Sequence, residues 1–206
     1  MNNLYIYACS YGKYGTSNGP KAHKWVDQES FGDFLAKSLN LNLVNRSYPG
    51  GCNYHIFKNI MKDVLLGNFD NTDTILVQWT YLGRAYHNDQ EKTVMPNNPE
   101  FFDYYKNYYN DLQSLCNLLT FNFYVKNKIK CPYYFTVVEN LQDLSKINEL
   151  IFQEIKSDPC FLTIKNMSPI EYLKKLDNKE LMLECHHPSV KGHKLLSEIF
   201  YQLMVM

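Results

Sequence analysis

Hydrophobic positions along the chain follow two alternating patterns. The first is a short, almost uninterrupted apolar run bounded by polar or glycine-rich residues, which is typical of a buried β-strand. Such runs occupy residues 4–9, 41–45, 74–79 and 133–138, and a shorter run at 161–164 predicts a fifth strand. Strands without polar alternation are typical of a parallel sheet that is covered on both faces. The pattern therefore predicts a buried parallel sheet.

The second pattern places apolar residues three or four positions apart, which predicts helices with one buried face. These segments cover residues 25–39, 53–66, 101–119, 140–156, 168–176 and 190–203. The helix at 168–176 has the clearest start, because Ser168 is a favourable N-cap and Pro169 fits the first helical position. Residues 83–100 are polar and contain two prolines, which predicts a long loop.

Strands and helices alternate from one end of the chain to the other. Parallel strands joined by helices form α/β folds in which helices cover both faces of the sheet. We therefore expect a three-layer α/β/α sandwich. The 206 residues suffice for one domain with a sizeable core, and neither a repeat nor a linker divides them. We expect a single domain over residues 1–206.

Charge and cysteine content exclude several classes of protein. The 21 basic and 21 acidic side chains give a net charge of zero, whereas broad binding to nucleic acid or anionic membranes needs a basic surface. We therefore expect neither as a partner, although a local basic patch is compatible with this balance. Six cysteines without a CxxC pair are typical of reduced thiols. The sequence shows neither a signal peptide nor a membrane-spanning run, which predicts a cytoplasmic location.

Ligands of open α/β sheets bind beyond the carboxyl ends of the strands. Three places meet this criterion before any motif is considered. They are Ser10 after the first strand, Gly50 and Gly51 after the second, and Thr80 after the third. Because parallel strands end at one edge of a sheet, we expect these residues to gather there.

A second group of chemically capable residues lies near the other end of the chain, in Glu184-Cys185-His186-His187-Pro188. A nucleophilic serine needs an imidazole as general base, and the imidazole needs a carboxylate that fixes its tautomer. Glu184 precedes His187 by three residues, so a single turn can present both side chains to one site. We predict a triad of Ser10, His187 and Glu184, with His186 as the rival base.

The blocks around these residues resemble those of the SGNH, or GDSL-like, hydrolase superfamily over nearly the whole chain. In that superfamily a Gly-Asp-Ser block follows the first strand and carries the nucleophile, and a Gly follows the second strand. A Gly-x-Asn-Asp block follows the third strand, and an Asp-x-x-His-Pro block precedes the last helix. The matching pieces here are Ala8-Cys9-Ser10, Gly50 or Gly51, Gln78-Trp79-Thr80, and Glu184-x-x-His187-Pro188.

A divergent branch of the superfamily, found in bacterial and phage genomes, is similar in more detail. Its members begin with Gly-Cys-Ser-Phe, carry an Asn-x-x-x-x-Gly-Gly-x-Asn block, and have a strand ending in Trp-Thr with an Arg after it. Here these pieces are Ala8-Cys9-Ser10-Tyr11, the block from Asn45 to Asn53, and Trp79-Thr80 followed by Arg84. The resemblance implies a parallel, flavodoxin-like sheet and a serine hydrolase that requires no cofactor or metal.

The sequence departs from the superfamily pattern in its third block. Leu82 stands near the position of the superfamily's Asn, whose side chain helps to form the oxyanion hole. The resemblance then leaves Ser10, Gly50 or Gly51, and Thr80 to form that hole. Loss of one oxyanion donor typically lowers turnover about 100- to 1,000-fold. Two further residues are weaker candidates for substrate binding: Arg84, which could contact an anionic group, and Asn53, which could equally cap the following helix.

Other interpretations of these side chains are less favoured. Cys9 could be a thiol nucleophile, but strand alternation points it away from Ser10. Cys185, His186 and His187 lack the paired spacing of a structural zinc site. The Tyr-rich segment 104–109 could stack on sugar rings, although a packed helix face is the simpler reading.

The resemblance implies hydrolysis of short-chain acyl esters, with O-acetyl groups on a carbohydrate as the favoured substrate. The partner is then a small-molecule or carbohydrate ester. An acyltransferase with the same site, and a glycan-binding or assembly module without turnover, are the alternatives. The oligomeric state has no sequence signal.

Overall fold

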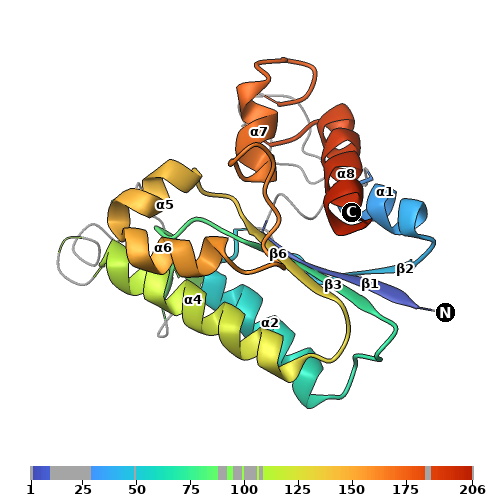
Figure 1. Ribbon diagram of the computed structural model, residues 1–206, viewed down its shortest axis with the longest axis horizontal. Coiled ribbons are helices and arrows are strands. Elements are labelled where there is room, and N and C mark those ends of the chain that lie inside the picture. Colours follow the sequence, from blue (N-terminus) through green and yellow to red (C-terminus); the bar gives the residue numbers. More distant parts are fainter. Residues whose placement is uncertain are drawn as a thin grey trace.

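The computed structural model describes residues 2–9, 29–48, 50–87, 92–94, 99, 106, 109–183 and 187–205, with the backbone alone at 85–87 and 92–94. Its centre is a sheet of four parallel strands (Figure 1): β1 (Asn3–Tyr7), β2 (Asn42–Asn45), β3 (Thr74–Trp79) and β6 (Tyr133–Val137). Their order is β2-β1-β3-β6, and each neighbouring pair is parallel. The predicted parallel sheet is confirmed.

Helices cover both faces of this sheet, as expected for a three-layer α/β/α sandwich (Figure 1). The first face carries α2 (Asn53–Leu65), α4 (Asp111–Lys128), α5 (Leu141–Ile147) and α6 (Glu149–Lys156). The opposite face carries α1 (Phe31–Leu39), α7 (Pro169–Lys175) and α8 (Val190–Val205). The predicted fold class is confirmed.

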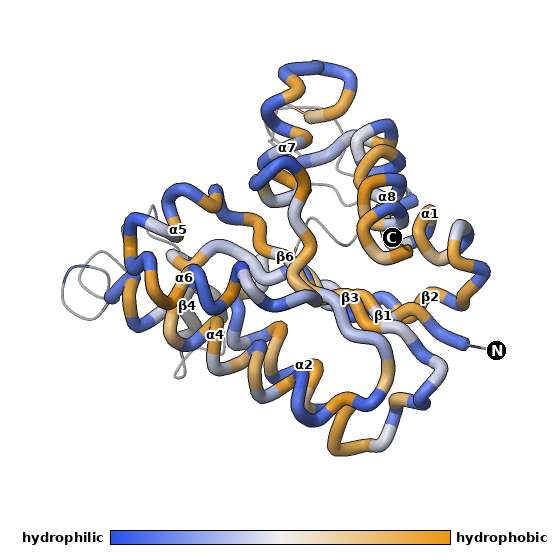
Figure 2. Tube along the Cα trace, in the orientation of Figure 1, coloured by the Kyte–Doolittle hydropathy of each residue, from blue (hydrophilic) through white to orange (hydrophobic). Residues whose placement is uncertain are grey.

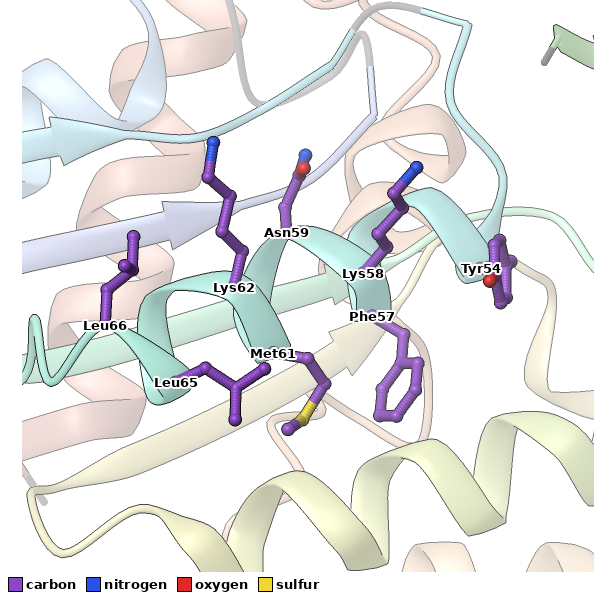
Figure 3. Close-up of a pocket in the computed structure, with 8 residues that line it drawn as sticks. All are labelled: Tyr54, Phe57, Lys58, Asn59, Met61, Lys62, Leu65 and Leu66. Atoms are coloured by element: carbon purple, nitrogen blue, oxygen red, sulfur yellow. The ribbon is translucent and has the colours of Figure 1, made fainter.

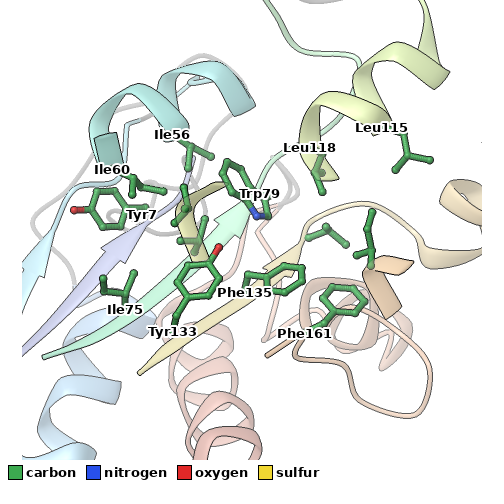
Figure 4. Close-up of a cluster of buried hydrophobic side chains, with 14 of the residues drawn as sticks. Tyr7, Ile56, Ile60, Ile75, Trp79, Leu115, Leu118, Tyr133, Phe135 and Phe161 are labelled. Atoms are coloured by element: carbon green, nitrogen blue, oxygen red, sulfur yellow. The ribbon is translucent and has the colours of Figure 1, made fainter. Parts of the chain in front are cut away.

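Two hydrophobic cores lie between these layers, because successive strand residues point to opposite faces of the sheet. Figure 4 shows the core beneath α2 and α4, where Trp79 and Phe135 extend from the sheet toward the helices. The second core lies under α1, α7 and α8, and includes Ile6, Leu76 and Leu196. Hydrophobic residues are prominent along α8 in Figure 2.

Several predicted boundaries are wrong. Of the helix predicted at 101–119, residues 101–105, 107 and 108 lie outside the described part of the chain, and the described helix α4 runs from Asp111 to Lys128, beyond the predicted end. Asn110 caps α4, because its side chain accepts the Gln113 N–H. The segment 140–156 forms two helices rather than one, and Asn148 caps the second. Residues 161–164 form no strand; Phe161 makes only an isolated parallel bridge to Phe135.

The region predicted as a loop at 83–100 contains two short antiparallel strands, β4 (Ala85–His87) and β5 (Lys92–Val94). Helix α1 confirms the end of the segment predicted at 25–39, whereas residues 25–28 lie outside the described part of the chain. Helix α7 confirms the predicted Ser168 cap, since the Ser168 hydroxyl accepts the Glu171 N–H.

No described helix combines the length and the apolar character needed to cross a membrane. The five cysteines of the described segments, at positions 9, 52, 116, 131 and 160, are free thiols.

Candidate active site

The loops that follow β1, β2 and β3 meet at one edge of the sheet. The Tyr48 N–H donates to the Ala8 carbonyl over 2.9 Å, which holds the β2–α2 loop against the chain just beyond β1. Ser10 follows two residues later and lies outside the described residues. The structure thus places the predicted Gly50-Gly51 turn beside the segment that leads to Ser10.

The β2–α2 turn depends on glycine. Gly50 has a φ of 73°, in the left-handed region that other residues adopt with strain. The Gly51 N–H donates to the Tyr48 carbonyl over 3.0 Å and thereby closes the turn. No hydrogen bond of the Gly50 N–H is found among the described residues. Of the two predicted backbone donors, Gly50 is therefore the one available to a ligand.

Asn53 connects this turn to the end of β3. Its side-chain oxygen accepts the Thr80 N–H over 2.7 Å, and its amide nitrogen donates to the Thr80 carbonyl over 3.2 Å. Asn53 and Thr80 are both buried. The predicted helix cap is wrong, because Cys52 is the N-cap of α2 and Asn53 is its first residue. The side chain instead fixes the backbone of Thr80.

Arg84 connects the same two loops a second time. Its Nη1 donates to the Gly51 carbonyl over 3.4 Å and to the Thr80 hydroxyl over 3.2 Å. The guanidinium carbon lies 5.3 Å from the centre of the Tyr81 ring. Within the described segments no carboxylate forms an ion pair with Arg84. The Arg84 guanidinium therefore lies between Gly51 and Thr80, two of the predicted oxyanion residues, and is bound there by uncharged oxygens.

Glu139, two residues after the end of β6, holds the segment that follows β3. Its carboxylate accepts the Leu82 N–H over 2.8 Å. Burial raises the pKa of Glu139, and the Leu82 N–H partly offsets that rise. The Leu82 side chain is buried, so the position where the superfamily has Asn offers neither a polar side chain nor a free N–H.

His187 lies on a short hairpin that precedes α8. The Leu183 N–H donates to the His187 carbonyl over 2.8 Å, and Met182 forms an antiparallel bridge with Pro188. The hairpin packs tightly against α8, because a Cβ at Gly192 would lie 2.1 Å from the Leu181 carbonyl oxygen. His187 is half-buried, while Glu184 and His186 lie outside the described residues.

His193 connects α8 to the start of α1. Its Nδ1 accepts the Phe31 N–H over 3.3 Å, and its buried Nε2 has no hydrogen-bond partner among the described residues. Burial, followed by the charge of His187, lowers the pKa of His193 to about 4, and Asp33 acts weakly in the opposite direction.

The alternative chemical sites gain no support from the described geometry. Cys9 is fully buried in the core beneath α1 and α8. Cys185, His186 and most of the Tyr-rich segment lie outside the described residues. Within the part of the chain that the structure describes, no three His, Cys, Asp or Glu side chains gather as metal ligands.

Two residues that organise this edge were not found as such from the sequence. Glu139 was missed although it directly follows a predicted strand, which is the criterion that identified Ser10 and Thr80. Asn53 was considered, but the sequence gives no indication that its amide pairs with a backbone 27 residues away.

No protein-family model matches the chain, and no curated protein matches it. Solved structures do match over almost their full length. A psychrotrophic esterase, EstA from Pseudoalteromonas sp., has a TM-score of 0.60 at 14% identity, with 100% of this chain and 97% of that chain covered. A lipase/acylhydrolase from Enterococcus faecalis has a TM-score of 0.57 at 12% identity, with 98% and 94% covered.

A member of the lipolytic protein G-D-S-L family from Veillonella parvula DSM 2008 has a TM-score of 0.57 at 10% identity, with 100% of this chain and 99% of that chain covered. Lipases and esterases of this kind recur among the matches. The chain has the SGNH hydrolase fold. At these identities the likeness establishes the fold alone.

Proposed function

We propose that the chain is a serine ester hydrolase of the SGNH type. Ser10 is the nucleophile, His187 the general base and Glu184 the carboxylate that orients the imidazole. The observation that carries the proposal is the Asn53–Thr80–Arg84–Gly51 network, which joins the two loops beside the segment leading to Ser10. Its neighbours in fold are lipases and esterases, which supports the same chemistry.

In the proposed mechanism the Ser10 hydroxyl attacks the ester carbonyl while His187 accepts its proton. The tetrahedral intermediate then collapses to an acyl-enzyme, and His187 delivers the proton to the leaving alcohol. Water attacks the acyl-enzyme in the second half of the reaction, with His187 again as base. Glu184 stabilises the imidazolium that forms in each half.

The oxyanion that develops in each step needs positioned donors. We assign the backbone N–H groups of Ser10 and Gly50 to this role. The Thr80 N–H donates to Asn53, so Thr80 contributes its hydroxyl rather than its backbone. That hydroxyl accepts a hydrogen bond from Arg84, which polarises it and directs its own proton away from Arg84. Arg84 thereby adds positive charge beside the Thr80 hydroxyl and the Gly51 carbonyl.

The substrate that we favour is a short-chain acyl ester, and within that class an O-acetyl group on a carbohydrate. Turnover of p-nitrophenyl acetate, butyrate and decanoate measures the preferred chain length. Release of acetate from acetylated xylan tests the carbohydrate part separately. Equal or higher rates on decanoate would overturn the short-chain assignment while leaving the esterase assignment intact.

The decisive experiment compares the parent chain with Ser10→Ala and His187→Ala on p-nitrophenyl acetate. Each substitution should abolish turnover above the rate of the buffer, and a phosphonate inhibitor should add its mass to the parent but not to Ser10→Ala. Ser145→Ala, on the exposed surface of α5, is the matched control and should retain the parent rate. Unchanged turnover in Ser10→Ala would overturn the proposal.

Arg84→Lys tests the assigned oxyanion region. The shorter lysine side chain keeps the charge but does not place a donor where Arg84 Nη1 reaches both the Gly51 carbonyl and the Thr80 hydroxyl, so kcat should fall about 10-fold or more while KM changes little. Arg46→Lys, at the only other arginine and paired with Asp63, controls for the loss of an arginine and should retain kcat. An unchanged kcat in Arg84→Lys would remove Arg84 from the site.

A glycan-binding module without turnover is the second candidate, and Leu82 is the observation that favours it. The buried Leu82 side chain replaces the superfamily's polar donor, and Glu139 occupies the Leu82 N–H. This candidate predicts no phosphonate labelling of Ser10 together with saturable binding to an acetylated glycan. Labelling of Ser10 in the parent chain would exclude it.

A further inference from the structure

A groove of about 630 Å³ runs along the outer face of α2. Eight residues line it, and all belong to α2 and its C-terminal cap: Tyr54, Phe57, Lys58, Asn59, Met61, Lys62, Leu65 and Leu66. Figure 3 shows Lys58 and Lys62 extending on one side of the helix, and Phe57 and Met61 on the other. The groove therefore has a cationic side and an apolar side.

The apolar residues of this groove are unusually exposed. Leu65 is 81% exposed and Leu66 is 63% exposed, although both could be polar at no cost to the core. Tyr54 is 42% exposed at the opposite end of the groove. Adjacent exposed hydrophobic residues that line one groove are typical of an interaction surface, whereas single exposed residues are not.

All charged side chains that line the groove are positive. Its lining contains two lysines and no carboxylate. The acidic residue of α2, Asp63, is buried, accepts the Tyr7 hydroxyl over 2.6 Å and pairs with Arg46. Asp63 is therefore turned away from the groove, and no carboxylate among the residues that line it accompanies Lys58 and Lys62.

Helix α4 continues this surface. Phe57 stacks on Phe121 and makes an edge contact with Tyr124, so α4 lies directly beside the groove. Tyr124 is 43% exposed, and the Lys128 ammonium lies 5.5 Å from the centre of its ring. Together the groove and this pair form what we call the α2–α4 face.

We propose that the α2–α4 face binds the surface of an anionic membrane. Exposed leucines and tyrosines beside lysines are the residues with which peripheral proteins contact anionic lipid surfaces. A protein partner fits less well, because lysine is depleted at protein–protein interfaces. The zero net charge of the chain does not conflict with this, because a neutral chain can still carry lysines locally, here Lys58 and Lys62 on α2 and Lys128 on the neighbouring α4.

The expected strength of binding follows from the charges. Each lysine near an anionic surface contributes about 1 kcal/mol, which corresponds to about five-fold in partitioning. Lys58, Lys62 and Lys128 together should therefore favour anionic over neutral vesicles by about 100-fold at low salt. Added salt should reduce this ratio, because exposed charges are screened.

The test measures co-sedimentation of the full chain with phosphatidylcholine vesicles, with and without phosphatidylglycerol. The parent should bind the anionic vesicles, and Lys58→Glu with Lys62→Glu should lower that binding at least about 25-fold. Lys175→Glu with Lys179→Glu changes the net charge equally at exposed positions, on and just after α7 on the other side of the sheet (Figure 1). That control should bind as the parent does.

Leu65→Asn with Leu66→Asn tests the apolar part and should also weaken binding, with an unchanged melting temperature. The proposal fails if the parent binds neutral and anionic vesicles equally, or if both charge-reversed pairs lose binding alike. It also fails if the parent is a dimer in light scattering that the leucine substitutions dissociate, because the face would then bind a second copy. Turnover of a soluble ester should be the same in all of these variants, so this test is independent of the proposed function.

Discussion

The side chain of Asn53 forms two hydrogen bonds with the backbone of Thr80, one to each of its polar groups. This pairing resembles one rung of a β-ladder, with a side-chain amide in place of the second strand. It ties the first turn of α2 to the end of β3 across 27 residues of sequence. Because Arg84 also joins Gly51 to Thr80, the two loops behave as one unit in our proposed site.

Asn53→Ala should therefore impair both stability and turnover. It leaves the buried N–H and carbonyl of Thr80 without partners, which costs about 1–3 kcal/mol of unfolding free energy. Movement of the loop by about 1 Å would lower kcat by up to about 100-fold. Urea unfolding and ester turnover measure the two effects. Asn59→Ala makes the same chemical change on the same helix and should leave kcat unaltered; equal losses in both variants would contradict the role of Asn53.

Two substitutions of Glu139 should change the unfolding free energy in opposite directions. Its pKa is raised by burial, so the folded state holds the carboxyl proton more tightly than the unfolded state does. Stability contributed by that proton is lost as pH rises through the folded-state pKa. Glu139→Gln removes this loss while its amide oxygen still accepts the Leu82 N–H. The variant should be more stable than the parent at pH 7 and lose that advantage near pH 4.

Glu139→Ala completes the comparison, because it removes the acceptor as well as the charge. The buried Leu82 N–H then lacks a partner, which should lower the unfolding free energy by about 1–3 kcal/mol relative to Glu139→Gln. Denaturant unfolding across pH 4 to 7 measures both variants. If the Gln variant is less stable than the parent throughout this range, burial does not determine the pKa of Glu139.

Gly192→Ala tests the hairpin that carries His187. The added Cβ would lie 2.1 Å from the Leu181 carbonyl oxygen, so the hairpin must move away from α8. Overpacking of this kind costs about 1–3 kcal/mol, and a shift of His187 by about 1 Å would lower kcat about 100-fold. Gly67→Ala is the control: Gly67 has a φ of 66° and open space around its Cα. That variant should lose some stability and no turnover.

The layers of the fold could be predicted from the sequence, because buried parallel strands have a simple apolar pattern. The run at 74–79 coincides with β3, and Ser168 caps α7 as predicted. The end of α4 at Lys128 was predicted too early, at residue 119, because the apolar spacing of this helix is weak. The apolar run at 161–164 led to the wrong prediction of a strand. Its residues are joined to β6 by one isolated bridge, from Phe161 to Phe135.

Prediction of the site was limited for a different reason. Gly50, Gly51 and Thr80 were placed at one edge by the strand rule alone, and the structure brings their loops together. The contacts that join them use side chains on backbone groups, as in Asn53 with Thr80 and Glu139 with Leu82. Such pairs depend on tertiary geometry and leave no periodic pattern in a sequence.

His193 provides a prediction of pH dependence. Burial first, and the charge of His187 second, lower its pKa from 6.5 to about 4, while Asp33 on α1 acts weakly in the opposite direction. Because the folded-state pKa lies below the unfolded one, the unfolded chain binds the extra proton between these values. Stability from His193 is therefore complete above about pH 6.5 and is lost as pH falls toward 4, by about 3 kcal/mol in total.

His193→Asn separates this titration from the structural role of His193. The amide oxygen can still accept the Phe31 N–H, while no proton can be gained at low pH. The unfolding free energy of this variant should therefore depend less steeply on pH between 4 and 6.5, by up to about 1.4 kcal/mol per pH unit. His55→Asn should flatten the pH profile less than His193→Asn does. Burial also lowers the pKa of His55, but His55 is only half-buried. Parallel pH profiles for the parent and His193→Asn would show that His193 is not the group that couples folding to pH.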